Sequence, residues 1–490
     1  MKKSLFRILT ASALAISIIG SGVSVQPVNA QQSKGLVYIV QENDTIYSIS
    51  RMFHSSVYRL EIRNYLNDSS VISAGDKLYI PGFDDLSGTL SPVQISIGDT
   101  PLSLMRASRM DRTTFNRINF LTSSDAAFVG QKFFTLVSDS KPTQLRVPVT
   151  DGGLTGLETA ARSGTNPWTL AEYNSLPGTW YLVPNDILYL PASSSSNEIL
   201  PGIQEIDSTD LQQGVTAVFT AKGSSVSNLK ANLDFPVDDL DTMQKDASAG
   251  KPITSIPIID EIHTLNFFPN TDGNYVALQG VPRMTVPGMA LLTLSIQTAD
   301  GANYSLDQNI KVKQVDYGYD APMQVADNEV DPAVTIPEAE FYFKTVAPAT
   351  SEKMWSGPFL PPTSTPTAIN DVFGRLRAFN GSDWIYWHSG LDYAGGEGVP
   401  ILAMADGTVI YTGELTVRGN ATIIDHGWGV YTVYCHQSKV EVKVGDKVKA
   451  GQEIGLIGAT GRVTGPHLHL DVIVGGVQVD PEQWLTQTLP

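Results

Sequence analysis

The chain has 490 residues and a formal net charge of −17, with 33 Lys and Arg against 50 Asp and Glu. This length predicts about three domains, and a hydrophobic content of 42% is ordinary for globular domains that bury a core. The acidic balance excludes nucleic acid as a partner, because no stripe of basic residues is available to neutralise phosphates.

The start of the chain has the pattern of a cleaved export signal. Basic residues among the first seven positions precede an apolar stretch over 8–19, and Val28-Asn29-Ala30 offers small residues before a cleavage point. We therefore expect a signal peptide over residues 1–30 and an exported protein that is secreted or located in the cell wall or periplasm. The apolar stretch is short for a transmembrane helix, with an uncleaved anchor as the alternative. No other stretch is apolar enough, so we expect no membrane span after cleavage.

Cysteine usage limits how the exported chain is held together. Cys435 is the only cysteine, so no intramolecular disulfide can form. The lack of a cysteine near the cleavage point also excludes a lipoprotein. The folded domains must therefore rely on their apolar cores.

A repeat of 55 residues follows the signal. Asn64 recurs as Asn119 and Asn174, and a polar turn before each asparagine and a closing strand after it recur at the same offset. Matching offsets at all three anchors predict three tandem copies of one unit. Each copy is expected to contain a strand, two short helices and a second strand, because a polar cap precedes apolar residues at helical spacing. The copies cover residues 35–82, 91–138 and 144–192.

The first copy closes with Gly75-Asp76-Lys77-Leu78-Tyr79-Ile80-Pro81. With its asparagine and its βααβ order, it resembles the LysM module. The resemblance implies binding to the N-acetylglucosamine-containing glycan of peptidoglycan or chitin. The second copy lacks the closing proline and the third lacks the aspartate of the Gly-Asp-Thr turn. The alternative for these two copies is therefore that they are spacers.

The middle of the chain changes to a β-rich pattern. Residues 193–200 form a Ser-rich linker by composition. Several short strands over 201–315, with a hairpin signal at Asp300-Gly301, predict an immunoglobulin-like sandwich. Residues 316–370 are expected to connect this domain to the last one, with one short helix near 338–345.

Histidines are concentrated at the end of the chain, where five of the seven follow residue 387. His467 and His469 lie on a predicted strand, so both imidazoles share one face. Two imidazoles on a stiff strand suit metal binding or proton transfer, and a solvated pair is the alternative. Cys435 is expected to point into the core, away from His436, because strand residues alternate between faces.

Residues 371–490 resemble the M23 family of zinc metallopeptidases, of the lysostaphin type. The motifs that carry the resemblance are, in chain order, Phe373-Gly374-Arg375, His388-Ser389-Gly390-Leu391-Asp392, Ala405-Asp406-Gly407-Thr408-Val409, Asp425-His426-Gly427, Tyr434-Cys435-His436, Val444-Gly445-Asp446-Lys447-Val448, Thr464-Gly465-Pro466-His467-Leu468-His469 and Val479-Asp480-Pro481. The resemblance implies a Zn²⁺ site and a mainly antiparallel β fold.

Carried over position by position, the resemblance assigns a role to five residues. It makes His388, Asp392 and His469 the Zn²⁺ ligands, and it makes His436 and His467 the catalytic histidines. Two imidazoles and one carboxylate leave the fourth zinc position open, which is typical of a catalytic site. His426 is interpreted as structural, and Asp471 stands where the family often has Glu.

The resemblance implies an exported zinc-dependent endopeptidase that hydrolyses peptide stems or crosslinks of peptidoglycan and is anchored to glycan by LysM modules. The alternative is a non-catalytic cell-wall binding protein that activates other cell-wall hydrolases. That alternative predicts a missing metal ligand, and none is missing here. The expected fold class is therefore multidomain: α+β repeats, an all-β sandwich and a mainly antiparallel β metallopeptidase domain.

Overall fold

The structure is a computed structural model that describes most of the chain. The described residues are 35–66, 72–122, 127–137, 144–149, 156–174, 176, 187–191, 198–236, 262–325, 330–364, 368–382, 384 and 386–490. They fall into two compact units, Met1–Leu90 and Ser91–Pro490, which are described separately. The predicted signal peptide and most of the Ser-rich linker lie outside the described residues. Among the residues that are described, no helix is long and apolar enough to cross a membrane.

The first unit contains one βααβ module. Its elements are β1 (Gly35–Ile39), α1 (Ile46–Met52), α2 (Val57–Asn64) and β2 (Lys77–Tyr79), and β1 pairs antiparallel with β2. The predicted polar cap begins α1, since the Thr45 hydroxyl accepts from the Ser48 backbone N–H. Asn64 joins α2 to β2, because its amide donates to Leu60 O and Tyr79 O and accepts from Tyr79 N at 2.6–2.9 Å. The side chain of this asparagine therefore supplies hydrogen bonds to backbone groups near the end of α2 and on β2.

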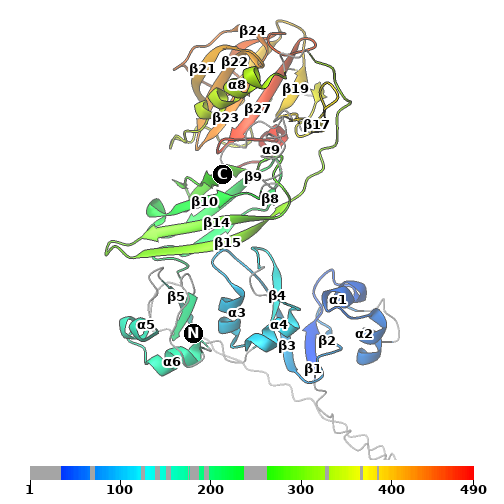
Figure 1. Cartoon of the computed structure of the whole chain (residues 1–490), viewed down its shortest axis with the longest axis vertical. Helices are drawn as coiled ribbons and strands as arrows, with labels where there is room; N and C mark the ends of the chain where they lie inside the picture. The colour runs from blue at the N-terminus through cyan, green and yellow to red at the C-terminus, as the bar shows by residue number, and fades with distance from the viewer. Residues whose placement is uncertain are drawn as a thin grey trace, which may run out of the picture. The chain divides into compact units, whose positions relative to one another are not determined.

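The second unit begins with two further modules of the same kind (Figure 1). The first of them has the elements β3 (Ser87–Gln94), α3 (Pro101–Ser108), α4 (Arg112–Ile118) and β4 (Lys132–Leu136). The second has the elements β5 (Gln144–Pro148), α5 (Gly156–Ser163), α6 (Pro167–Tyr173) and β6 (Ile187–Pro191). Asn119 donates to Phe115 O and Phe134 O, and Asn174 donates to Leu170 O and Tyr189 O. The 55-residue spacing thus corresponds to one repeated hydrogen-bond arrangement.

Two antiparallel sheets follow, built from short strands. One has the order β12 (Phe268–Pro269), β13 (Tyr275–Gly280), β9 (Thr216–Lys222) and β7 (Glu205–Ser208). The other has the order β11 (Ile262–Thr264), β10 (Lys230–Asp234), β14 (Met289–Gln297), β15 (Asn303–Lys313) and β8 (Leu211–Gln212), in which only the β8–β15 pair is parallel. One apolar core takes side chains from both sheets, for example Phe219 and Leu292. The hairpin predicted at Asp300-Gly301 is confirmed by the antiparallel pairing of β14 with β15.

The C-terminal region is mainly antiparallel β, as predicted. Its large sheet has the order β16 (Ile369–Asp371), β19 (Leu391–Ala394), β27 (His467–Val474), β23 (Val430–Tyr434), β22 (Gly419–Gly427), β21 (Gly407–Leu415) and β25 (Lys447–Val448), with β28 (Val477–Val479) also paired to β27. Smaller sheets join β17 (Leu376–Arg377) to β18 (Tyr386–Trp387), and β20 (Pro400–Leu402) to β26 (Glu453–Ile457) and β24 (Gln437–Val440). The last helix is α9 (Pro481–Thr486).

Part of the expected connecting region packs onto this sheet. The helix α8 spans Pro332–Thr345 and is longer than the short helix predicted near 338–345. Its Tyr342 is fully buried in one cluster with Tyr431 of β23 and Ile473 of β27. Figure 1 shows α8 lying over these strands. The helix is therefore a covering layer of the C-terminal sheet as well as a link in the chain.

Candidate metal centre

Two neighbouring strands place the predicted ligands side by side. Strands β19 and β27 pair antiparallel, and in their register Asp392 lies opposite His469. His388 precedes β19 by three residues and is almost completely buried. The two strands thus bring together residues that are 77 positions apart in the chain.

Three donor atoms converge at this point. Asp392 Oδ1 lies 3.0 Å from His388 Nε2 and 2.8 Å from His469 Nδ1, and the two imidazole nitrogens are 3.1 Å apart. In the described part of the chain, this is the one group of at least three His, Cys, Asp or Glu that could hold a metal ion. The structure therefore brings together all three residues that the sequence analysis proposed as ligands.

The far side of each ligand imidazole is fixed by a hydrogen bond. His388 Nδ1 donates to Val372 O at 2.8 Å, so its Nε2 faces the other donors. His469 is turned the other way, since its Nε2 lies 3.1 Å from Asp471 Oδ1 and 3.3 Å from Ser389 Oγ. Such outer hydrogen bonds set the tautomer and the ring orientation of metal-binding histidines.

Charges around the three donors favour binding of a cation. Burial raises the pKa of Asp392, but hydrogen bonds from His388 and His469 outweigh it and hold the pKa well below its usual range. Burial lowers the pKa of His469, but Asp471 and Asp392 outweigh it and raise the pKa to about 9. A proton on His469 is therefore stabilised between two carboxylates, in a position where a metal ion can replace it.

The two predicted catalytic histidines lie next to this group. The ring centroids of His436 and His467 are 4.9 Å apart, and that of His436 is 6.0 Å from His469. Nδ1 of His436 donates to Thr460 O at 2.8 Å, and Nδ1 of His467 donates to Gly465 O at 2.9 Å. In a neutral imidazole this bond places the proton on Nδ1 and leaves Nε2 as the acceptor, and Nε2 of His467 is 3.8 Å from Asp392 Oδ1. Burial, together with His469 and His467, lowers the pKa of His436 to about 3, so this imidazole is neutral at pH 7.

His436 has a backbone conformation that sequence reasoning missed. Its φ of 61° lies in the left-handed region, which is uncommon for residues other than glycine. Its N–H donates to Arg418 O at 2.9 Å, which helps to hold the backbone there. Strained backbone of this kind is found at functional sites.

Two residues of the C-terminal motifs lie outside this group. His426 is completely buried, where Nδ1 donates to Asp406 O at 2.8 Å and Nε2 is 2.7 Å from Thr432 Oγ1. Burial lowers its pKa to about 4. Cys435 is also completely buried, which confirms the prediction that it points into the core, and burial raises the pKa of its thiol. Neither residue contributes a donor atom to the metal group.

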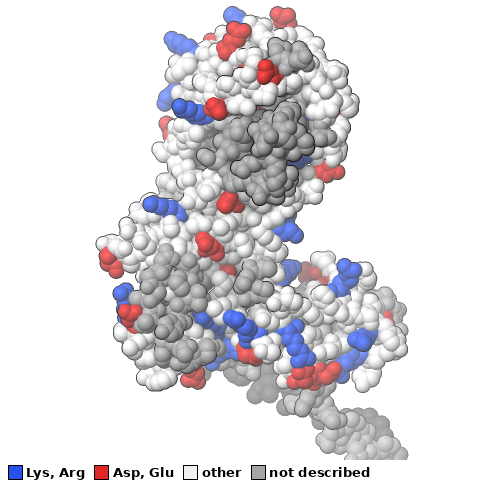
Figure 2. Space-filling model, in the orientation of Figure 1, with Lys and Arg blue, Asp and Glu red and all other residues white. Residues whose placement is uncertain are grey.

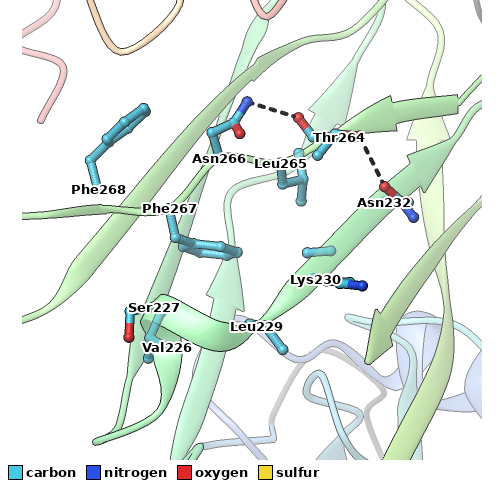
Figure 3. A pocket seen from close by; sticks show the side chains of 11 residues that line it. Val226, Ser227, Leu229, Lys230, Asn232, Thr264, Leu265, Asn266, Phe267 and Phe268 are labelled. Atoms are coloured by element: carbon cyan, nitrogen blue, oxygen red, sulfur yellow. Dashed lines mark hydrogen bonds between the residues drawn. The ribbon is translucent and has the colours of Figure 1, made fainter. Parts of the chain in front are cut away.

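A pocket with a volume of about 380 Å³ lies in the β-sandwich (Figure 3). Phe267 and Leu229 line it, together with a polar edge where Thr264 bonds Asn232 and Asn266. Its lining contains no His, Cys, Asp or Glu, and Lys230 is the one ionisable side chain in it. On the face of the protein in Figure 2, basic and acidic residues are interspersed.

Comparison with known proteins identifies two segments. Residues 386–481 match the model of Peptidase family M23, and residues 38–81 match the model of the LysM domain. Both resemblances noted in the sequence are thereby confirmed for these segments.

Several known proteins are similar to part of the chain. It is 48% identical over 119 residues to the peptidoglycan DD-endopeptidase ShyA of Vibrio cholerae, which is 24% of this chain and 28% of that protein. It is 44% identical over 94 residues to the DD-carboxypeptidase/endopeptidase Mpg of Neisseria meningitidis serogroup B, which is 19% of this chain and 22% of that protein. The chain thus spans about a quarter of the length of these relatives. Among solved structures, the catalytic domain of the antimicrobial peptidase lysostaphin from Staphylococcus simulans is 32% identical, with 24% of this chain and 92% of that chain covered and a TM-score of 0.23.

Proposed function

Because residues 386–481 are a peptidase family M23 domain and residues 38–81 are a LysM domain, we propose that this protein is an exported, zinc-dependent endopeptidase that hydrolyses peptide stems or crosslinks of peptidoglycan. The observation that carries the proposal is the convergence of His388, Asp392 and His469 beside two further imidazoles. The names of the relatives, DD-endopeptidase in Vibrio and DD-carboxypeptidase/endopeptidase in Neisseria, favour a crosslink between D-amino acids as the bond cleaved.

The donor set fits a zinc ion. Zn²⁺ with bonds of about 2.0–2.1 Å to nitrogen and oxygen has tetrahedral edges of roughly 3.3 Å. The three donor atoms are 2.8–3.1 Å apart, so a small outward movement would admit the ion. His388 Nε2, Asp392 Oδ1 and His469 Nδ1 would hold it and leave one position open. When bound, zinc supplies a water with a pKa of about 7 and polarises the scissile carbonyl.

His436 and His467 are proposed to move protons and to stabilise charge. Both have Nδ1 bonded to a carbonyl, so the Nε2 atoms can accept a proton from the attacking water or, once protonated, donate a hydrogen bond to the oxyanion. The low pKa of His436 keeps it neutral and able to accept at pH 7. The two roles are shared by the pair, and we assign neither role to one residue alone.

The upstream modules are proposed to hold the enzyme on the cell wall. LysM binding to glycan would raise the local concentration of peptide substrate without a change in the active site. Residues 91–138 and 144–192 are proposed as LysM-like modules, supported by the repeated bonds of Asn119 and Asn174. The proposed remaining boundaries are 1–30 for the signal peptide, 35–82 for the first module, 193–200 for the linker, 201–315 for the sandwich, 316–370 for the connection and 371–490 for the peptidase.

The sandwich is proposed to be immunoglobulin-like and to act as a spacer. Its sheet order β7-β9-β13-β12 corresponds to strands A-B-E-D, and β15-β14-β10-β11 of the other sheet corresponds to G-F-C with an added C′ strand. The short strand β8 is an addition at the β15 edge. The stabilising disulfide of antibody domains has no counterpart, because the chain has one cysteine. The apolar core between the sheets provides the stability instead.

The proposed activity is tested with purified peptidoglycan. The protein should release new peptide termini, a chelator should abolish the release, and added Zn²⁺ should restore it. Mass spectrometry of the fragments identifies the bond cleaved. If the zinc-loaded protein releases no fragments alone but accelerates another cell-wall hydrolase, the activator alternative replaces this proposal.

A further inference from the structure

Asp471 connects the metal centre to a helix that precedes the M23 segment. One of its carboxylate oxygens, Oδ1, lies 3.1 Å from His469 Nε2. The other, Oδ2, accepts a hydrogen bond of 2.6 Å from the hydroxyl of Tyr342 on α8. The link spans 129 positions of the chain, and Tyr342 lies 44 residues before the start of the family match. It therefore joins two parts of the chain that sequence comparison treats as separate.

Both residues of this link are completely buried, with exposed fractions of 0%. A carboxylate without solvent needs fixed partners, because an unpaired buried charge is costly. The guanidinium of Arg418 supplies positive charge nearby, since its Cζ is 3.8 Å from the centre of the Tyr342 ring. Glu338 of α8 pairs in turn with Arg418 Nη1 at 3.1 Å.

The same helix also supports the second half of the site. The Glu338 carboxylate accepts from the backbone N–H groups of Val417 at 2.8 Å and Arg418 at 3.3 Å. The carbonyl of Arg418 accepts from the backbone N–H of His436, the residue with the left-handed backbone. Two buried side chains of one helix thus reach a predicted ligand and a predicted catalytic histidine, each through one intermediate residue.

We propose that α8 is part of the metal centre and that Tyr342 is a positioning residue, which holds Asp471 so that His469 presents Nδ1 to the metal. The proposal rests on the zinc site described above. Its physical basis is orientation: a carboxylate can only accept, so the phenol donates in this bond and fixes which carboxylate oxygen is left to face His469. Loss of an outer partner of a metal-binding histidine typically weakens metal affinity by about 10–100-fold.

The test compares two tyrosines of the same buried cluster. Tyr342→Phe removes only the hydroxyl that bonds Asp471. Tyr431→Phe is the matched control, because Tyr431 is equally buried in that cluster and its hydroxyl bonds Pro348 O instead of a residue of the metal centre. Zinc affinity of the full chain is measured by competition with a chromophoric chelator, and thermal unfolding of the metal-free proteins is measured in parallel.

We expect Tyr342→Phe to bind zinc about tenfold more weakly, and Tyr431→Phe to bind as the wild type does within about twofold. Tyr342→Phe should also lose more thermal stability than Tyr431→Phe, because it removes a donor to the buried Asp471 carboxylate. The zinc affinity, and not the unfolding temperature, therefore separates a positioning role from a packing role. In an Asp471→Ala background, Tyr342→Phe should have no further effect on affinity, because its route to His469 is already removed.

The outcomes separate this inference from the proposed function. Failure of the wild type to bind zinc contradicts the zinc site and, with it, this inference. Normal wild-type binding with unchanged affinity in Tyr342→Phe overturns the role of Tyr342 alone. Equal losses of zinc affinity in both tyrosine variants also overturn it. So does an undiminished loss of zinc affinity on Tyr342→Phe in the Asp471→Ala background, since either result indicates an effect of packing. If Tyr342→Phe does not fold, the zinc affinity of Asp471→Ala is compared with that of the wild type. Equal zinc affinities refute the inference.

Discussion

The histidine outside the metal centre gives the sharpest prediction for stability. His426 is completely buried and neutral, with Nδ1 donating to Asp406 O and Nε2 facing the Thr432 hydroxyl. Burial lowers its pKa from 6.5 to about 4 in the folded protein. Between these values the unfolded chain binds a proton that the folded chain does not. The contribution of His426 to the free energy of unfolding is therefore complete above about pH 6.5. This contribution is lost as the pH falls towards about 4.

The size of the effect follows from the shift. A difference of about 2.5 pKa units at about 1.36 kcal/mol each sets a limit of about 3.4 kcal/mol. At about pH 4.5, where the transition is incomplete, the loss should be about 2.6 kcal/mol. This is a substantial part of the free energy of unfolding of an ordinary domain.

The assay is guanidinium unfolding at pH 7 and at pH 4.5, for the wild type and for His426→Asn, both with chelator present. Trp355, Trp428 and Trp484 belong to the core of this domain, so their fluorescence reports its unfolding. Asparagine can still donate to Asp406 O but does not titrate. Other groups cancel in the comparison, including Asp480, whose pKa burial raises to about 6 and whose effect has the opposite sign. Equal losses of stability in both proteins between the two pH values would refute the reasoning.

Three further predictions concern the proposed activity. Stoichiometric zinc should be lost in each of the three variants His388→Ala, Asp392→Ala and His469→Ala. Metal analysis that finds tightly held zinc in all three would contradict the proposed ligand set. His436→Ala and His467→Ala should keep zinc and fold but lose about 10²-fold or more in peptidoglycan turnover, so a variant that retains the wild-type rate identifies a non-catalytic histidine. Deletion of residues 35–82 should slow cleavage of insoluble sacculi at low enzyme concentration, with recovery at high concentration and no change on a short soluble peptide; an equal rate on sacculi at all concentrations would argue against anchoring.

The repeat could be read from the sequence because its anchors act within each module. Asn64 bonds the backbone of Tyr79, 15 positions away, and Asn119 and Asn174 do the same at the same distance in sequence. An interaction closed within one short module must recur with that module. The spacing of 55 residues therefore reflects local geometry, whereas the number of modules that bind glycan is a matter of surface residues that the spacing does not report.

The metal centre was predictable in part. Strand alternation places His467 and His469 on one face, and the same alternation extends to Asp471, which the sequence analysis noted only as a departure from the family. The cross-strand register of Asp392 with His469 depends on the pairing of a whole sheet, which no local pattern reveals. In the sequence, only the family resemblance indicated that Asp392 and His469 belong to one site.

The contribution of α8 was not predictable from local sequence. The structure begins the helix at Pro332 with Asp331 as its cap, and Pro337 lies inside it. An internal proline normally argues against a helix, because it removes a hydrogen bond and clashes with the preceding turn. Packing of Tyr342 and Val346 against the sheet outweighs that cost. Tertiary contacts of this kind carry no signal in the spacing of residues along the helix.

The choice of ring nitrogen shows most clearly why residue types alone do not define the site. His388 presents Nε2 because its Nδ1 is bonded to Val372 O, whereas His469 presents Nδ1 because its Nε2 faces Asp471. The two histidines proposed as ligands thus present different atoms, and the choice is made by acceptors that are not proposed ligands. For His436 and His467 the acceptors are backbone carbonyls, which substitution of a side chain does not remove. Asp371 Oδ2 lies 3.6 Å from His388 Nδ1, but the hydrogen bond of that nitrogen is to a carbonyl. Nε2 of His469 instead faces a carboxylate, which Tyr342 holds. Changes to side chains that are not proposed ligands should therefore act on metal binding through His469 more strongly than on the proton transfer proposed for His436 and His467.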